Sequence, residues 1–112
     1  MACLPQEATS TYPLNQQVYA VGYGTTSYNK HNTTNQLNYV NLQMYSMTKC
    51  YWARPHENFQ ICAGDLKGER DTCSGDSGGP LYVLDSIEGK LKYVSVGIVS
   101  YGHHCALPNK PS

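Results

Sequence analysis

Short runs of apolar and β-branched residues recur along this chain, and clusters of turn-forming residues separate them. Runs of about four to eight such residues, bounded by Gly, Pro, Asn or Asp, are typical of β-strands. The pattern predicts five strands, at residues 17–21, 37–47, 59–63, 80–84 and 92–101. Short strands at this spacing predict an all-β fold, either a small antiparallel barrel or a sandwich.

The same pattern predicts which residues of the second strand face inward and where the chain turns. Tyr39, Leu42 and Met44 are expected to face the core. Residues 85–90 are expected to form the turn of a hairpin between the last two strands. Residues 25–36 have no apolar periodicity and are expected to form an exposed polar loop.

Length and charge limit the protein to a narrower class. With 112 residues, the chain is long enough for one domain and too short for two. Eight basic and eight acidic residues cancel, and charged residues make up only 14% of the chain. This balance argues against nucleic acid or an anionic membrane surface as a partner, because both require a basic patch. No apolar run approaches the roughly 20 residues of a membrane span.

The cysteines indicate an oxidising compartment. Five cysteines are present, enough for two disulfides and one remaining thiol (Cys3, Cys50, Cys62, Cys73 and Cys105). None lies in a Cys-x-x-Cys pair, so we expect no metal site. Asn32 begins an Asn-Thr-Thr glycosylation sequon, which has meaning only in a secreted chain. The first residues do not resemble a signal peptide, which predicts that the chain lacks its natural beginning.

One segment carries the residues needed for catalysis. Residues 71–81 read Asp-Thr-Cys-Ser-Gly-Asp-Ser-Gly-Gly-Pro-Leu. Ser77 lies among glycines, whose backbone freedom allows a sharp turn that exposes the hydroxyl. The amides of Gly75 and Ser77 can point to one place and stabilise an oxyanion. A Gly-rich surface turn is the simpler interpretation of a bare Gly-x-Ser-x-Gly. An α/β-hydrolase requires a helix directly after the serine, which the following Gly-Gly-Pro prevents.

This segment and four others resemble the chymotrypsin/trypsin family of serine endopeptidases. Cys3-Leu4-Pro5 resembles the linker between the two barrels of that family, and residues 21–24 resemble its Gly-Trp-Gly turn. Residues 61–64 resemble the segment that precedes the specificity loop, and residues 97–102 resemble the strand that pairs with substrate. The resemblance covers nearly the whole chain, in the family's order. It implies the second antiparallel Greek-key β-barrel of a trypsin-like protease over residues 1–112, incomplete at both ends.

The resemblance also implies a role for several residues. Ser77 is implied as the nucleophile that attacks a peptide carbonyl, and Gly75 and Ser77 as the oxyanion-hole amides. Asp71 is implied at the floor of the specificity pocket, where a carboxylate favours cleavage after Lys or Arg. Ser100 and Gly102 are implied to line the pocket and bind substrate. The partners implied are a polypeptide substrate or a protein inhibitor, with no cofactor.

By the family pattern, Cys50 pairs with Cys62, and Cys73 pairs with Cys105. The usual partner of Cys3 lies in a part of the family domain that this chain does not contain.

Three other positions depart from the common family pattern. Val18 and Val83 stand where many members have a disulfide, so both partners are replaced together. Ser112 stands about where a glycine often lines the specificity pocket, and it is expected to narrow access for a long basic side chain.

The family mechanism also needs a histidine base and an aspartate that orients it, and both belong to the first half of the domain. No segment here resembles that half, and the four histidines are expected to be loop residues (His31, His56, His103 and His104). Asp76 lacks the terminal ammonium that normally neutralises it, which predicts a collapsed oxyanion pocket. The chain alone is therefore expected to be inactive. The alternative interpretation is a non-catalytic protease homologue, a secreted binding module acting through residues 25–36 and 51–58.

Overall fold

A computed structural model of the chain describes residues 3–5, 12–26, 34–53, 60–102 and 105–112, with the side chains of 51–53 left out. The elements are β1 (Gln17–Gly22), β2 (Asn38–Tyr45), the 3₁₀ segment η1 (Met47–Ala53), β3 (Cys62–Gly64), β4 (Pro80–Ile87) and β5 (Lys90–Ile98). Among the described residues there is no α-helix, and none of the helical segments is long and apolar enough to cross a membrane. The predicted all-β class is therefore confirmed.

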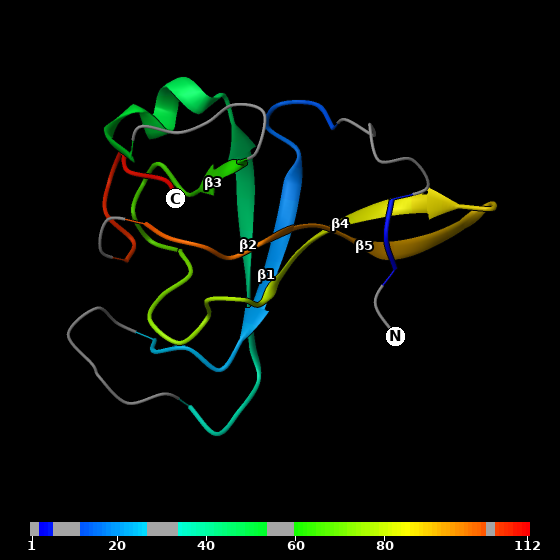
Figure 1. The fold of residues 1–112 in the computed structure, drawn as a ribbon, viewed down its shortest axis with the longest axis horizontal. Helices are drawn as coiled ribbons and strands as arrows, with labels where there is room; N and C mark the ends of the chain where they lie inside the picture. Colours follow the sequence, from blue (N-terminus) through cyan, green and yellow to red (C-terminus); the bar gives the residue numbers. More distant parts are fainter. Residues whose placement is uncertain (1–2, 6–11, 27–33, 54–59, 103–104) are drawn as a thin grey trace.

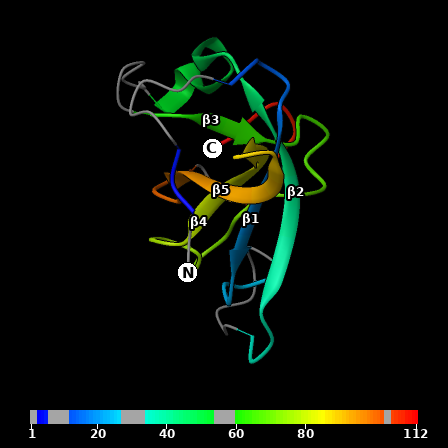
Figure 2. The same cartoon turned by 90° about the vertical axis from the view of Figure 1, so that its right-hand side faces the viewer.

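The five strands form one antiparallel sheet in the order β3-β2-β1-β4-β5 (Figure 1). The first three strands run as a meander, and β4 returns to pair with β1 on its free side. This order is the Greek-key arrangement that was expected. Figure 2 shows the sheet strongly twisted, with the β4–β5 hairpin turned across the β1–β2 pair.

The core consists of seven buried residues drawn from all five strands (Val18, Ala20, Leu42, Ala63, Leu81, Val83 and Val94). Val18 and Val83 are both fully buried. Their strands pair antiparallel with Tyr19 opposite Tyr82 and Ala20 opposite Leu81. Continued by one residue, this register places Val18 beside Val83, so two valines pack where many family members have a disulfide.

The inward face of β2 differs from the prediction at one residue. Leu42 is 3% exposed and Met44 packs against the core, as expected. Tyr39 is 75% exposed, so its predicted inward orientation is wrong. Alternate strand residues point to opposite faces, and Val40, Leu42 and Met44 occupy the core face. An odd-numbered residue therefore faces outward.

The hairpin between β4 and β5 is longer than predicted, and its turn is shorter. Glu88 and Gly89 alone form the turn, with φ of 52° and 78°. Two successive residues with positive φ are typical of a type I′ hairpin turn. The strands on either side therefore reach Ile87 and begin at Lys90, which corrects the turn predicted at residues 85–90.

The amino-terminal segment, which is not one of the five strands, contacts this hairpin. Cys3 forms a parallel bridge with Val94, and the Ser95 amide donates to the Cys3 carbonyl over 2.8 Å. In Figure 1 this short blue segment crosses β5. The Cys3 thiol is free, as expected.

Candidate active site

The loop that carries Ser77 is held in a tight turn and tied to the chain that follows β5. The Asp76 amide donates to the Cys73 carbonyl (3.0 Å), and the Gly79 amide donates to the Asp76 carbonyl (3.0 Å). The Gly78 amide donates to the Val99 carbonyl (2.9 Å). Ser77 is exposed at the top of this turn. Figure 1 shows the loop on the side of the molecule opposite the projecting β4–β5 hairpin.

The backbone on both sides of Ser77 adopts conformations that suit glycine. Gly75 has a φ of 97° and Gly78 a φ of 83°. Within the described residues, neither the Gly75 amide nor the Ser77 amide donates a hydrogen bond, whereas the amides of Asp76, Gly78 and Gly79 do. Two donors beside an exposed hydroxyl are therefore left to bind an acceptor.

Asp76, which follows Gly75, is stabilised by backbone amides. The Gly24 amide donates to its Oδ1 over 2.8 Å, and the Cys73 amide donates to its Oδ2 over 2.9 Å. Hydrogen bonds from amides to a carboxylate are charge-assisted and stronger than neutral ones. They offset part of the cost of burying the Asp76 carboxylate. From the sequence, a terminal ammonium was expected to be needed to neutralise this charge. The expected collapse of the oxyanion pocket stays a prediction.

The Asp76 carboxylate packs against the Gly-Tyr-Gly turn at residues 22–24, and this contact leaves no room for a side chain at either glycine. A methyl group on Gly24 would lie 2.6 Å from Asp76 Oδ2, and one on Gly22 would overlap the same carboxylate. Real Cβ atoms do not approach other atoms so closely. The two glycines are therefore the sequence signal that this carboxylate packs on the turn.

Asp71 lies at the start of the same loop, partly buried and bonded on both oxygens. The Thr72 amide donates to Oδ1 (2.8 Å) and the Ala106 amide to Oδ2 (3.0 Å). The Ser112 hydroxyl lies 3.4 Å from Oδ1. Burial raises the pKa of Asp71 above its usual value, and these hydrogen bonds oppose the rise.

A cavity of about 210 Å³ lies beside Ser77. Its lining includes the predicted substrate-binding residues Ser100 and Gly102, together with Ser112. Asp71, although a described residue, does not line it. The structure therefore brings the nucleophile candidate and the predicted pocket residues together, with the carboxylate behind Ser112.

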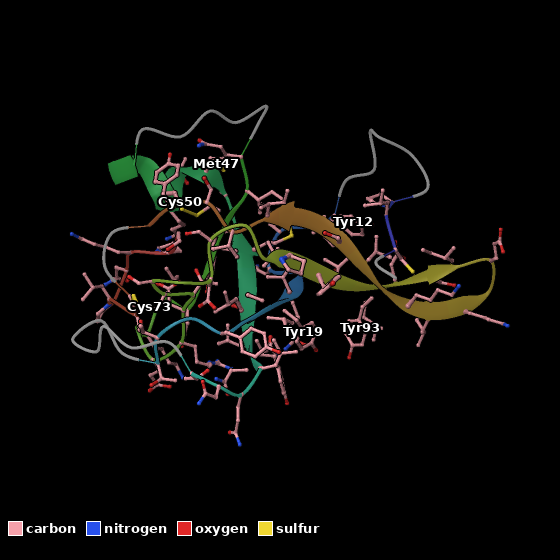
Figure 3. The ribbon with its side chains drawn as sticks, turned by 60° about the horizontal axis from the view of Figure 1, so that its bottom comes forward. Tyr12, Tyr19, Met47, Cys50, Cys73 and Tyr93 are labelled. Atoms are coloured by element: carbon pink, nitrogen blue, oxygen red, sulfur yellow. A yellow bond between two sulfur atoms is a disulfide. The ribbon has the colours of Figure 1, made fainter. Side chains whose placement is uncertain are left out.

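Two disulfides cross-link the described chain, and one of them contributes both its cysteines to the lining of this cavity. Cys73 is joined to Cys105 with 5.3 Å between their Cα atoms, and Cys50 is joined to Cys62 with 6.0 Å. These are the pairs that the resemblance implies. Figure 3 shows them at separate places, with Cys50 within η1 and Cys73 in the loop that carries Ser77. The first of these disulfides links the segment carrying Asp71 to the segment carrying the Ala106 amide.

Several predicted features lie outside the described residues. They are the four histidines, Asn32 of the sequon and most of the loops at 25–36 and 51–58. The site therefore contains the nucleophile candidate and its neighbours, and no described residue can act as the histidine base.

Comparison with known proteins gives a consistent result. The sequence model of the family described as Trypsin matches residues 1–112. Transmembrane protease serine 11C of Mus musculus is 40% identical over 114 residues, which cover 98% of this chain and 25% of the relative. Transmembrane protease serine 11E of Mus musculus is 35% identical over 113 residues, covering 97% of this chain and 26% of the relative. The chain spans about a quarter of the length of these relatives.

Proposed function

The chain belongs to the trypsin family of serine proteases, and on that premise we propose that it carries the nucleophile of a serine endopeptidase. The observation that supports this most is the arrangement around Ser77. Its hydroxyl is exposed on a two-glycine turn, beside two amides without a partner among the described residues. A non-catalytic binding module has no physical need for this arrangement, so the endopeptidase is the better proposal.

Each residue of the loop then has a chemical role. The Ser77 oxygen attacks the carbonyl carbon of the scissile peptide bond, and its proton passes to a general base. The amides of Gly75 and Ser77 bind the negative oxygen that forms on that carbonyl. The bond to the leaving amine breaks, the base returns the proton to that amine, and an acyl-enzyme remains for water to hydrolyse.

The base and its orienting aspartate are assigned to polypeptide outside these 112 residues. No described residue of the chain occupies that position, and no segment resembles the family's Ala-Ala-His-Cys. A serine hydroxyl without a base is a poor nucleophile at neutral pH. We therefore expect the chain alone to be inactive and the amino-terminal half of a protease domain to be its partner.

Substrate preference is assigned to Asp71, with Ser100 and Gly102 binding the substrate backbone. In support, Asp71 is partly buried and its Oδ1 lies 3.4 Å from the hydroxyl of Ser112, which lines the cavity beside Ser77. A carboxylate at the floor of such a pocket favours Lys or Arg before the scissile bond. The substrate is a polypeptide, and a protein inhibitor would bind the same surface.

An extracellular location is part of the proposal. The two disulfides suit an oxidising compartment. In such a compartment Asn32 is a candidate for glycosylation. The relatives named above are called transmembrane proteases, and attachment of a longer protein to a membrane is compatible with an extracellular catalytic domain.

A chimera tests this proposal. The chain replaces the matching segment of mouse transmembrane protease serine 11C, which supplies the rest of the catalytic domain. We expect the chimera to hydrolyse peptides with Lys before the scissile bond, and Ser77→Ala to lower kcat by about 10⁶-fold. Ser86→Ala, at an exposed position of β4, is the matched control and should leave kcat unchanged. A folded chimera that fails to cleave, while the unmodified mouse protease cleaves, would contradict the proposal.

A further inference from the structure

The cavity beside Ser77 ends on a hydroxyl and not on a carboxylate. Ser112 lines the cavity, and Asp71 does not. The Ser112 Oγ lies 3.4 Å from Asp71 Oδ1. A basic side chain that enters the cavity therefore meets the Ser112 hydroxyl before it meets the carboxylate.

Ser112 is held in this position by its backbone. Its amide donates to the Ala63 carbonyl over 2.8 Å, and its carbonyl accepts from the Ala63 amide over 2.7 Å. These bonds attach residue 112 to β3. The side chain fills the space opposite Gly102, where an added methyl group would overlap the Ser112 Oγ and lie 2.9 Å from its Cβ. The backbone bonds to Ala63 and the contact with Gly102 together hold the hydroxyl in the cavity lining.

The acceptor sites on Asp71 are already mostly occupied. A carboxylate has about four acceptor sites, two on each oxygen. Oδ1 faces the Thr72 amide and the Ser112 hydroxyl, and Oδ2 accepts from the Ala106 amide. An arginine guanidinium binds a carboxylate best through two parallel hydrogen bonds, one to each oxygen. The Thr72 side chain also hydrogen-bonds to Asp71. Oδ1 is therefore fully occupied and at most one site on Oδ2 is free, so that paired contact is not available here.

A lysine ammonium needs a different set of hydrogen-bond acceptors from an arginine guanidinium. It is a compact charge with three donors that need no planar partner. The Ser112 oxygen can accept from one of these donors while its own proton points to Asp71 Oδ1. The ammonium is then linked to the carboxylate through the hydroxyl.

We infer that Ser112 is a specificity-determining residue that selects lysine over arginine before the scissile bond. The hydroxyl accepts a hydrogen bond from the lysine ammonium and blocks the paired approach of the arginine guanidinium to Asp71. The inference rests on the proposed endopeptidase function and narrows its basic preference to one side chain.

Two small cations of equal chain length test the inference without catalysis. Butylammonium and butylguanidinium are titrated into the full chain, and binding is followed by NMR shifts of the amides near Asp71. We expect butylammonium to bind about tenfold more tightly, and Ser112→Gly to remove or reverse that preference. Ser112→Ala should weaken butylammonium binding, because it removes the acceptor. Ser86→Gly, at an exposed position far along β4, is the matched control for the glycine substitution.

The chimera described above provides a second readout. Its kcat/KM for Lys substrates should exceed that for Arg substrates, and Ser112→Gly should lower the Lys-to-Arg ratio by about tenfold. A chimera that cleaves both alike, with or without Ser112, overturns the inference and leaves the endopeptidase proposal intact. A chimera that cleaves neither contradicts the endopeptidase proposal. In that case the cation titration still decides whether Ser112 discriminates, and equal binding of both cations overturns the inference.

Discussion

At the scale of single residues, one loop holds two carboxylates in different ways. Asp76 receives amides from Gly24 and Cys73 and packs on a glycine turn. Asp71 is desolvated enough that its pKa rises in spite of its hydrogen bonds. The first arrangement fixes the backbone next to Ser77. The arrangement of Asp71 keeps a carboxylate partly buried, so its negative charge is unfavourable until a cation binds.

Replacing Asp71 by asparagine should reveal this cost through pH. Because burial raises the pKa of Asp71 above 3.8, the folded chain holds its proton more firmly than the unfolded chain. Stability from this group is therefore full below about pH 3.8 and declines as pH rises through the folded pKa. We expect Asp71→Asn to change the free energy of unfolding little at pH 3 and to increase it at pH 7. Urea unfolding at both pH values measures this.

Asp65→Asn provides a control of opposite sign. The backbone hydrogen bond from Lys67 lowers the pKa of Asp65, with Arg70 contributing. The stability from Asp65 is present above about pH 3.8 and is lost as pH falls. Asp65→Asn should therefore be destabilising at pH 7 and nearly neutral at low pH. If both variants respond to pH in the same direction, the assignment for Asp71 is wrong.

The packing of Asp76 on its glycine turn predicts a specific steric effect. Gly24→Ala places a methyl group against the Asp76 carboxylate, and overpacking of this kind costs about 1–3 kcal/mol. In an Asp76→Ala background the clash is absent, so the same substitution should cost almost nothing. Urea unfolding of the four variants in this cycle gives the coupling energy. Gly89→Ala has no neighbour within 4 Å but a φ of 78°, so it measures the strain of a left-handed backbone without a steric clash. A coupling energy near zero would contradict the contact.

At this scale, the sequence predicts the chemical groups better than their partners. The glycine-flanked Ser77 and the preceding Asp71 are visible in one short motif. The amides that hold the two carboxylates are not. Gly24 lies 52 residues from Asp76, and Ala106 lies 35 residues from Asp71. Such contacts depend on the folded sheet, although the two glycines at 22 and 24 were a signal of close approach.

At the scale of elements, β1 and β4 meet through two buried valines. A disulfide between these positions is common in the family, and the register places Val18 beside Val83. We expect the double variant Val18→Cys/Val83→Cys to form a disulfide. Closing a loop of about 65 residues gives about 4 kcal/mol by chain-entropy arithmetic, before the loss of valine packing is subtracted.

Thiol alkylation and mass spectrometry measure this outcome. Cys3 is the free thiol of the parent chain, so the oxidised double variant should take up one label, like the parent. Val18→Cys alone should take up two labels. Three labels on the double variant would show that the two positions do not meet, and the register across β1 and β4 would be wrong.

Strand positions were predictable because the alternating apolar residues of this chain form a core on one face. The ends of the strands were harder to predict from the sequence. Asp85 and Ser86 are polar and were assigned to a turn, yet they continue β4. Their backbone pairs with β5, and the Tyr12 hydroxyl donates to Asp85 over 3.0 Å. Asp85 lies on the same face of β4 as Leu81 and Val83, whereas Ser86 is exposed. Polar residues at a strand end cannot be distinguished from turn residues until their partners are known.

At the scale of the whole molecule, the five described strands form one open sheet. Among the described strands, β3 and β5 are edges that do not pair with each other. A cavity of about 400 Å³ is lined by Ile61, which precedes β3, and by Val96 and Ile98 of β5. Ile98 is 71% exposed. Exposed apolar edges are prone to unwanted pairing with other chains, so we expect the chain alone to aggregate in a concentration-dependent way.

The most direct test of the central claim is to locate the reactive serine by covalent labelling. A fluorophosphonate that attacks activated serine hydroxyls is incubated with the chimera and with the chain alone, and the modified peptide is identified by mass spectrometry. We expect the label on Ser77 in the chimera and no label on the chain alone, because no described residue of the chain can act as the histidine base, which the mouse segment of the chimera would supply. A folded chimera labelled at another residue or nowhere, or a chain that is labelled by itself, would contradict the assignment of Ser77 as a nucleophile that requires a partner half.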